Sequence, residues 1–251
     1  MEALLTPLLS ALLLSLRIGP TLAFAPPFTL LRVPVLVRVL LGVSLAYWMG
    51  PGAGFSTLEA IPGPIELAVL VGQELFFGIA LALALQLCFA AIYMAGRTID
   101  IQAGFGLALL ADPATRTQTP LIGTVLAYVT AVIFFAVGGA TSLVEIWASS
   151  IRLMPLGSVG GLQDLSLVLN YLGTVFVLAT GLAGLILLSL FLIDMTVAFL
   201  SRTLPQMNVL LLGFQVKTMV LMAVLPLTIA TSSALFLRLV RVPLDSTPRF
   251  I

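Results

Sequence analysis

The stretch GRTIDIQAGFGLALLADPATRTQTP, residues 96–120, decides how this chain folds. It places two arginines, two aspartates, three glycines and two prolines between two of the longest uncharged runs in the chain. Within a bilayer, irregular backbone is tolerated only where protein buries it or where it lines a watery cavity, because unpaired N–H and C=O groups are costly in lipid. The stretch is therefore either a plain aqueous loop or an element of a pore.

The rest of the chain is apolar enough to indicate a membrane protein. Hydrophobic residues make up 61% of the 251 and charged residues 8%, with a mean hydropathy of +1.22. Soluble domains are only about 45–50% apolar. The net charge of +1 is too small for a nucleic-acid surface. The composition predicts an all-α integral membrane protein, with residues 1–251 forming one membrane domain and no nucleic acid as partner.

Most catalytic chemistries are excluded by the residues that are missing. Histidine is absent and Cys88 is the only cysteine, which excludes His-based triads, His/Cys zinc sites and disulfides within the chain. The only lysine, Lys217, precedes Thr218, but Val216 stands where a phosphate-binding P-loop needs glycine. We expect no catalytic residue, no metal and no cofactor, and therefore no enzyme.

Charged residues divide the chain into six apolar segments of about 14 to about 29 residues, against the roughly 20 that cross a bilayer as a helix. The segments are residues 18–31, 39–58, 75–96, 117–144, 165–193 and 218–237. They predict about six long helical passages that tilt or kink, with a break at Gly138-Gly139 and a kink at Pro226. Residues 4–31 could cross as a whole if Arg17 faces protein or snorkels.

The N-terminus resembles a secretory signal peptide in hydropathy but not in charge. Residues 4–16 followed by Ala23-Phe24-Ala25 imitate a signal peptide, but no base precedes the apolar run, so we expect the segment to be retained.

The charges of the loops give conflicting indications of topology. Paired bases on alternate loops favour a cytoplasmic side for those loops. With six spans, the basic C-terminal tail would then lie on the side of the membrane opposite to the cytoplasm, against the same rule. Either one segment does not cross, or the protein is not seated in lipid like a carrier.

Four acids and a set of small residues are candidates for specific contacts. Arg97 and Asp100 are three apart and would form a local ion pair on a helix. Glu74 and Asp194 flank apolar runs, where a carboxylate either pairs or serves a function, or else sits at the interface. Asp112 could form an intramembrane acid pair with Asp100, but no second signature accompanies the two residues.

Small residues at helical spacing, Ala80 with Ala84, Ala179 with Ala183 and Thr180 with Gly184, allow close helix contacts within the chain or with other subunits. Pro205, Gln206 and Asn208 form either a turn or a contact with a neighbouring subunit.

A family resemblance covers nearly the whole chain and rests on the order and spacing of many short matches. The matches are Arg17-Ile18-Gly19, Pro26, Pro34, Arg38, Ala95-Gly96, Ile99-Asp100, Gln102, Gly104-Phe105-Gly106, Asp112-Pro113, Gln118, Pro120, Phe134, Gly138-Gly139, Pro155-Leu156-Gly157, Arg202, Pro205-Gln206-Met207-Asn208, Gly213-Phe214 and Lys217. In these residues the chain resembles the FliR family of export-gate proteins in flagellar and virulence-type type III secretion. It departs from the family at Ala140, where histidine is common. The Gly213-Phe214-x-x-Lys217 form favours the flagellar branch.

The resemblance implies a subunit of a gate in the bacterial inner membrane, at the flagellar basal body. It implies tilted helical hairpins assembled with the smaller proteins FliP and FliQ, contacts with FlhB and FlhA, membrane lipid around the assembly, and unfolded substrates passing through it. In such a gate apolar faces would meet protein more than lipid, which would explain both the long runs and the failed charge count. The small-residue spacing and the polar break described above give the candidate packing residues Ala179, Thr180, Ala183, Gly184, Pro205, Gln206 and Asn208.

The resemblance further implies a loop near the pore axis that closes the channel at rest, and here it matches residues 104–116. The candidate plug residues are Gly104, Phe105, Gly106, Leu107, Leu109, Leu110, Asp112 and Pro113. Glycine would let the backbone turn, the apolar side chains would block ions by dewetting, and Asp112-Pro113 would end the segment.

The alternative function is a secondary solute transporter with a midplane acidic site at Glu74, Asp100 or Asp194. A second rival, an intramembrane enzyme, is disfavoured by the missing histidines and the unpaired carboxylates. A transporter is expected to show internal repeats, and none is convincing in this sequence.

Overall fold

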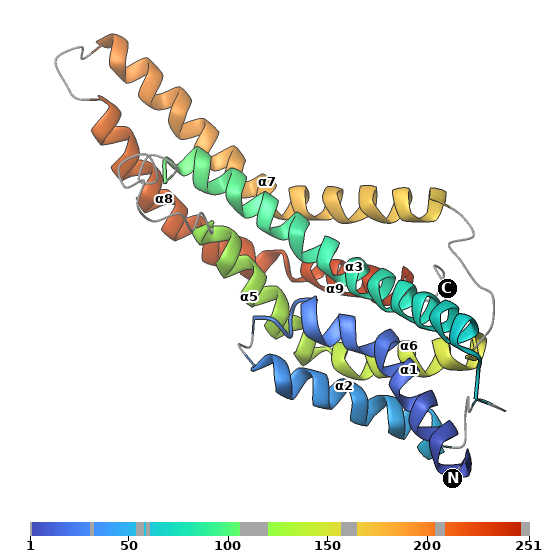
Figure 1. The fold of residues 1–251 in the computed structure, drawn as a ribbon. Coiled ribbons are helices and arrows are strands. Elements are labelled where there is room, and N and C mark those ends of the chain that lie inside the picture. Colours follow the sequence, from blue (N-terminus) through green and yellow to red (C-terminus); the bar gives the residue numbers. More distant parts are fainter. Residues whose placement is uncertain are drawn as a thin grey trace. The chain divides into compact units, whose positions relative to one another are not determined.

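The computed structural model describes residues 2–30, 33–53, 58, 61–105, 120–156, 165–203 and 209–246. Every regular element within these ranges is helical (Figure 1). The elements are α1 (Glu2–Phe24), α2 (Val35–Met49), the 3-10 turn η1 (Pro51–Ala53), α3 (Pro64–Ala103), α5 (Leu121–Ala136), α6 (Gly139–Leu153), α7 (Leu165–Thr203), α8 (Val209–Thr231) and α9 (Ser233–Ser246). The predicted all-α class is confirmed.

Four helices are long and apolar enough to span a membrane, namely α1, α3, α7 and α8. A fifth span results if α5 and α6, which are bent by 69° at their junction, are taken as one. With its 15 residues, α2 is about 22 Å long, less than the roughly 30 Å of a hydrocarbon core. The described helices thus offer four spans, or five with the α5–α6 pair, against the about six passages expected; α2, which comes from the second apolar segment, is too short to be counted.

Local sequence explains where the helices break. The break predicted at Gly138-Gly139 is present, because Gly138 has a positive φ of 78° and α6 begins immediately after it. The helix α8 contains Pro226, where the kink stays a prediction, and it ends five residues later, before α9 begins at Ser233. Proline also starts a helix: Pro64 is the first residue of α3, a position where its missing N–H costs nothing.

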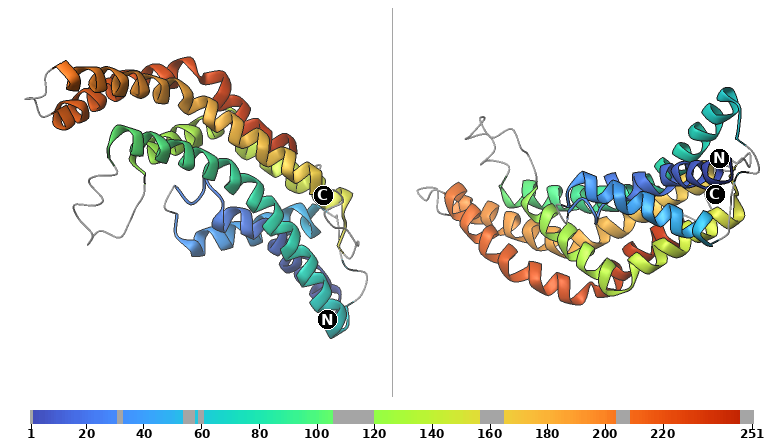
Figure 2. Two further views of the ribbon diagram at one scale, coloured as in Figure 1. Left: turned by 90° about the horizontal axis from the view of Figure 1, so that it is seen from above. Right: turned by 60° about the horizontal axis from the view of Figure 1, so that its bottom comes forward.

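The chain divides into two compact units, each described here by itself. Unit 1 comprises residues 1–88, 131–173 and 240–251, and unit 2 comprises residues 89–130 and 174–239. In unit 1, α2 lies alongside α1. In unit 2, α7 and α8 run side by side (Figure 2).

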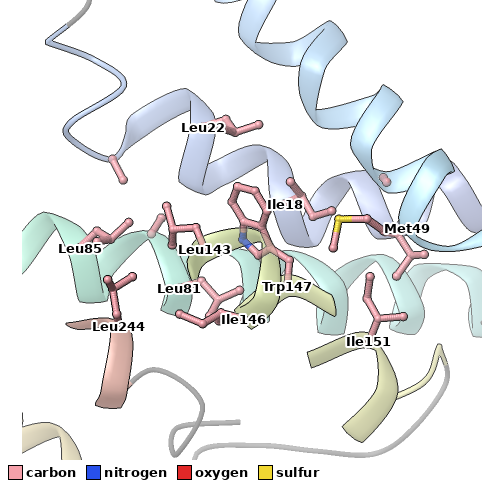
Figure 3. Packing of buried hydrophobic residues seen from close by; sticks show 14 of the residues in the cluster. Ile18, Leu22, Met49, Leu81, Leu85, Leu143, Ile146, Trp147, Ile151 and Leu244 are labelled. Atoms are coloured by element: carbon pink, nitrogen blue, oxygen red, sulfur yellow. The ribbon is translucent and has the colours of Figure 1, made fainter. Parts of the chain in front are cut away.

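The core of unit 1 is built around Trp147 of α6, which is almost completely buried. Figure 3 shows its indole ring among side chains from neighbouring helices, including Ile18 and Leu22 of α1 and Leu81 of α3. At Gly78 of α3 the helices come closer still, since a Cβ there would lie 2.3 Å from the carbonyl oxygen of Leu16. This contact brings the backbones of α1 and α3 together.

A buried ion pair joins three helices of the same unit. Arg17 of α1 donates from Nε and Nη2 to the two carboxylate oxygens of Glu74 on α3, each at 2.7 Å. Its Nη1 donates at 2.9 Å to the carbonyls of Ser150 and Met154, at the end of α6. The side chains are only 1% and 3% exposed, and the guanidinium lies 5.2 Å from the ring centroid of Phe77. Arg17 therefore faces protein, and Glu74 is a pairing residue rather than an interface anchor.

Candidate functional site

Residues 96–120 begin within the last turns of α3, and Gly104 and Phe105, directly after the helix, form a turn that we call the root turn. Gly104 has a positive φ of 89°. Its N–H donates to the carbonyl of Ile101 at 3.1 Å, and the Phe105 N–H donates to the carbonyl of Asp100 at 2.9 Å. This pair of bonds, around a left-handed glycine, closes many helix C-termini. Gly104 therefore turns the backbone, as expected of a glycine at this position.

The root turn packs against α8. The ring of Phe105 meets the ring of Phe214 edge to face, with centroids 6.2 Å apart and planes at 76°. A Cβ at Gly104 would lie 3.1 Å from the same Phe214 ring. Edge-to-face pairs of this kind add to the free energy of apolar burial. Phe214 therefore covers both residues of the turn.

Beside these rings, Gln102, Asp194 and Lys217 form a closed polar network that joins α3, α7 and α8. Lys217 Nζ lies 2.5 Å from Asp194 Oδ1 and donates to the main-chain carbonyl of Gln102 at 3.0 Å. The Gln102 side-chain amide donates to Asp194 Oδ2 at 3.0 Å. Each residue thus contacts the other two. Of the two alternatives for Asp194, the structure supports pairing.

Asp100 ties the end of α3 to the start of α5. Its Oδ1 and Oδ2 lie 3.1 and 3.3 Å from the backbone nitrogen of Ile122, which donates to them. A carboxylate at a helix N-terminus satisfies a free N–H and is stabilised by the helix dipole. Asp100 is itself 6% exposed. The ion pair with Arg97 stays a prediction, whereas the bond to α5 was not anticipated.

Two glycines bring the backbones of α3 and α5 into direct contact. A Cβ added at Gly96 would lie 2.1 Å from the Cα of Gly123. A Cβ at Gly123 would lie 2.8 Å from Cγ of Pro120 and 3.0 Å from the carbonyl oxygen of Tyr93. No side chain larger than hydrogen fits at this crossing.

Together, the glycine crossing, the Asp100–Ile122 bond, the aromatic pair and the polar network form what we call the frame. The frame fixes the described residues on both sides of segment 106–119, from the root turn to Pro120. It holds the ends of the segment with contacts from α3, α5, α7 and α8.

The predicted plug and packing residues fall into three groups. Gly104 and Phe105 lie in the frame. Ala179 and Ala183 are buried in the chain, whereas Thr180 is exposed and Gly184 partly so, with open space around a Cβ at Gly184. The residues that lie outside the described ranges are Gly106, Leu107, Leu109, Leu110, Asp112, Pro113, Pro205, Gln206 and Asn208.

Sequence reasoning missed Gln102 and Lys217 as members of the frame, and Arg17 as the partner of Glu74. One signal could have found the two ion pairs. Opposite charges placed in separate apolar runs are costly in a membrane unless they meet, and Lys217 is the only lysine of the chain.

The chemistry of the frame is structural. Among the residues described, no three His, Cys, Asp or Glu side chains gather into a group that could hold a metal ion. The carboxylates of Glu74, Asp100 and Asp194 all accept hydrogen bonds from protein groups.

Comparison with known proteins agrees with the residue pattern. The family model described as bacterial export proteins, family 1, matches residues 8–242. The chain is 27% identical over 214 residues to the flagellar biosynthetic protein FliR of Bacillus subtilis (strain 168), covering 82% of this chain and 80% of that protein. It is 27% identical over 235 residues to FliR of Aquifex aeolicus (strain VF5), covering 90% and 89%. It is 27% identical over 198 residues to the Yop proteins translocation protein T of Yersinia pestis, covering 74% and 76%.

Proposed function

This chain belongs to the bacterial export proteins, family 1, and on that premise we propose that it is a gate subunit of a type III protein export apparatus. Its relatives carry the names of flagellar biosynthetic and translocation proteins, and its helices are long and apolar enough to cross the inner membrane several times. The chain is an apparatus component and not an enzyme. We place it in the flagellar system, at the basal body.

The proposed mechanism is gating by the segment that follows the root turn. Gly106, Leu107, Leu109 and Leu110 would narrow the channel for unfolded substrates, and a constriction lined by apolar side chains excludes ions by dewetting. The observation that carries this proposal is the frame. Contacts from several helices hold both ends of one short segment, as a closure element at a pore requires.

Loss of the plug should open the ion barrier without preventing assembly. Deleting residues 104–110, or replacing Leu107, Leu109 and Leu110 by serine at unchanged length, should raise the leak of small ions severalfold, because water would wet the constriction. The leak is measured as ion flux across membranes of cells that hold the assembled gate.

Recovery of the complex in normal amounts is the control for this experiment. The serine variant separates apolarity from length, because it keeps every backbone atom. An intact ion barrier in both assembled variants would refute the plug.

The proposed partners are FliP and FliQ in the gate itself, with further contacts to FlhB and FlhA. The exposed faces of α7 and α8 support a role for these helices in assembly, because only 28% and 22% of their spanning windows are buried within the chain. Large exposed side chains on them include Phe191, Phe199 and Met219. Thr180 and Gly184 lie on α7 as well, and small residues let a neighbouring helix approach.

A leucine at Gly184 should block assembly while leaving the chain itself intact. The space around Gly184 is open, so the new side chain would fit in the isolated chain but would hold a partner helix away. Co-purification of the two smaller membrane proteins should fall, at an unchanged level of this chain in the membrane.

Two variants on the same helix control for this result. Leucine at Ser189, on another side of α7, should leave assembly normal. Leucine at Ala183, which is 1% exposed, should instead lower the level of the chain itself, because overpacking a filled site costs about 1–3 kcal/mol. Normal recovery of partners with Gly184→Leu would show that this face points elsewhere.

A secondary transporter remains the alternative function, but no contact among the described residues favours it. The three acids considered for its site are engaged by Arg17, by the Ile122 N–H, and by Lys217 with Gln102. A chain that is stable alone in mild detergent and moves a small solute would support the transporter against the gate.

A further inference from the structure

We propose that the Gln102–Asp194–Lys217 network is a releasable clasp, which holds the root turn on the α7–α8 hairpin and so sets the closed position of the gate. The inference rests on the gating function proposed above. Three features of the network carry it, namely its connectivity, its partial exposure and its position next to the Phe105–Phe214 contact.

The hydrogen bonds of the network converge on the end of α3. Gln102 is bound twice, through its side-chain amide to Asp194 and through its main-chain carbonyl to Lys217. That carbonyl belongs to the last turn of α3, where carbonyls lack partners within the helix and a positive charge is favourable. A simple ion pair between α7 and α8 would need neither contact. The ammonium of Lys217 therefore fixes a helix end and not only a neighbouring acid.

Partial exposure makes the clasp releasable. The side chains of Lys217 and Asp194 are 17% and 37% exposed, whereas the two side chains of the Arg17–Glu74 pair are 1% and 3% exposed. Separating a partly exposed pair costs less than separating a fully buried pair, whose charges would be left in a medium that solvates them poorly. Of the two ion pairs, the one beside the root turn is the one that can open and close.

Position links the clasp to the turn. Lys217 and Phe214 are three residues apart on α8 and so lie on one face of the helix. Lys217 holds Gln102, and Phe214 covers Gly104 and Phe105. One face of α8 therefore holds residues 102–105, through a polar contact at Gln102 and apolar contacts at Gly104 and Phe105. A shift of α7 against α8 would break the contacts of Asp194 with Lys217 and with Gln102, and so loosen the hold on the turn.

The test measures the root turn directly, in the full chain assembled with its partner proteins. Lys217→Met should speed hydrogen exchange at the amides of Gly104 and Phe105 about tenfold, because a hydrogen bond to a charged group is lost. The leak of small ions should rise in the same particles. Asp194→Asn, which is nearly the same size, should act in the same way and serves as the test if Lys217→Met does not assemble.

Two matched variants separate the clasp from a general loss of polarity. Lys217→Arg keeps the charge and several donors and should retain slow exchange and a low leak. Gln215→Leu removes a polar side chain from an exposed position of α8 and should change neither measurement.

Unchanged exchange in assembled Lys217→Met or Asp194→Asn particles would overturn the clasp, and so would faster exchange with no added leak. The variant with serine at Leu107, Leu109 and Leu110 leaves the root turn intact, so in the same assay it reports on the gating function separately. If that variant leaks and the Lys217 variant does not, the clasp fails while the gate stands. If neither leaks, the gating function itself fails.

Discussion

Replacing Glu74 by leucine should destabilise the folded chain by about 3–5 kcal/mol, because Arg17 would keep a buried charge without its carboxylate. Both side chains are almost fully buried, so water cannot take the place of Glu74. The remaining bonds of Arg17, to the carbonyls of Ser150 and Met154, are to neutral groups and do not balance the charge. The level of the chain in the membrane and the Tm of the purified complex should both fall.

Two variants test whether the unpaired charge is the cause. Glu66→Leu removes an exposed acid from the first turn of the same helix and should have little effect. The double variant Arg17→Leu, Glu74→Leu should recover a large part of the loss, because buried ion pairs can often be replaced by apolar pairs. If the double variant were as unstable as Glu74→Leu, the contacts of Arg17 with α6 would outweigh the ion pair.

Alanine at Gly96 should separate α3 from α5 and destabilise the chain by about 1–3 kcal/mol or more. The added Cβ would lie 2.1 Å from the Cα of Gly123 and 2.3 Å from its nitrogen. Because both are backbone atoms, no side chain can rotate to make room. The helices would have to move apart, and the bond from the Ile122 N–H to Asp100 would lengthen with them. The measurement is the Tm of the purified complex, with hydrogen exchange at the amide of Ile122.

The same substitution at Gly72 is the matched control. Gly72 lies in α3 too, but nothing lies within 4 Å of a Cβ there. Alanine is favoured over glycine in a helix by about 1 kcal/mol, so Gly72→Ala should leave the Tm unchanged or raise it. Equal Tm values for both variants would mean that α3 and α5 do not touch at Gly96.

These two contacts differ from the clasp in how deeply they are buried. The Arg17–Glu74 pair and the Gly96–Gly123 crossing leave no room for water or for a side chain, so they resist any change. The Lys217–Asp194 pair is only partly buried within the chain. We therefore expect substitutions at Glu74 and Gly96 to lower the amount of folded protein, and substitutions at Lys217 to change gating in protein that still assembles.

By itself, the sequence determined the class of the protein and several of its breaks. An apolar composition leaves helices as the natural way to satisfy backbone hydrogen bonds in lipid, which is why the all-α class was predicted correctly. Glycine is the residue that adopts a positive φ without strain, so Gly138 and Gly104 could be located as a helix break and as a turn. The order of short matches along the chain also indicated the family.

Only the tertiary structure decided which residues meet. Arg17 and Glu74 are 57 positions apart, and Gln102 and Lys217 are 115 apart. Helices such as α3 and α8 are apolar on nearly every side, so the hydrophobic pattern does not show which face turns inward. For the same reason the small residues of α7 could not be sorted from sequence into buried Ala183 and open Gly184. Crossings between helices settle such pairings, because each depends on where two distant segments come within a few ångströms of each other.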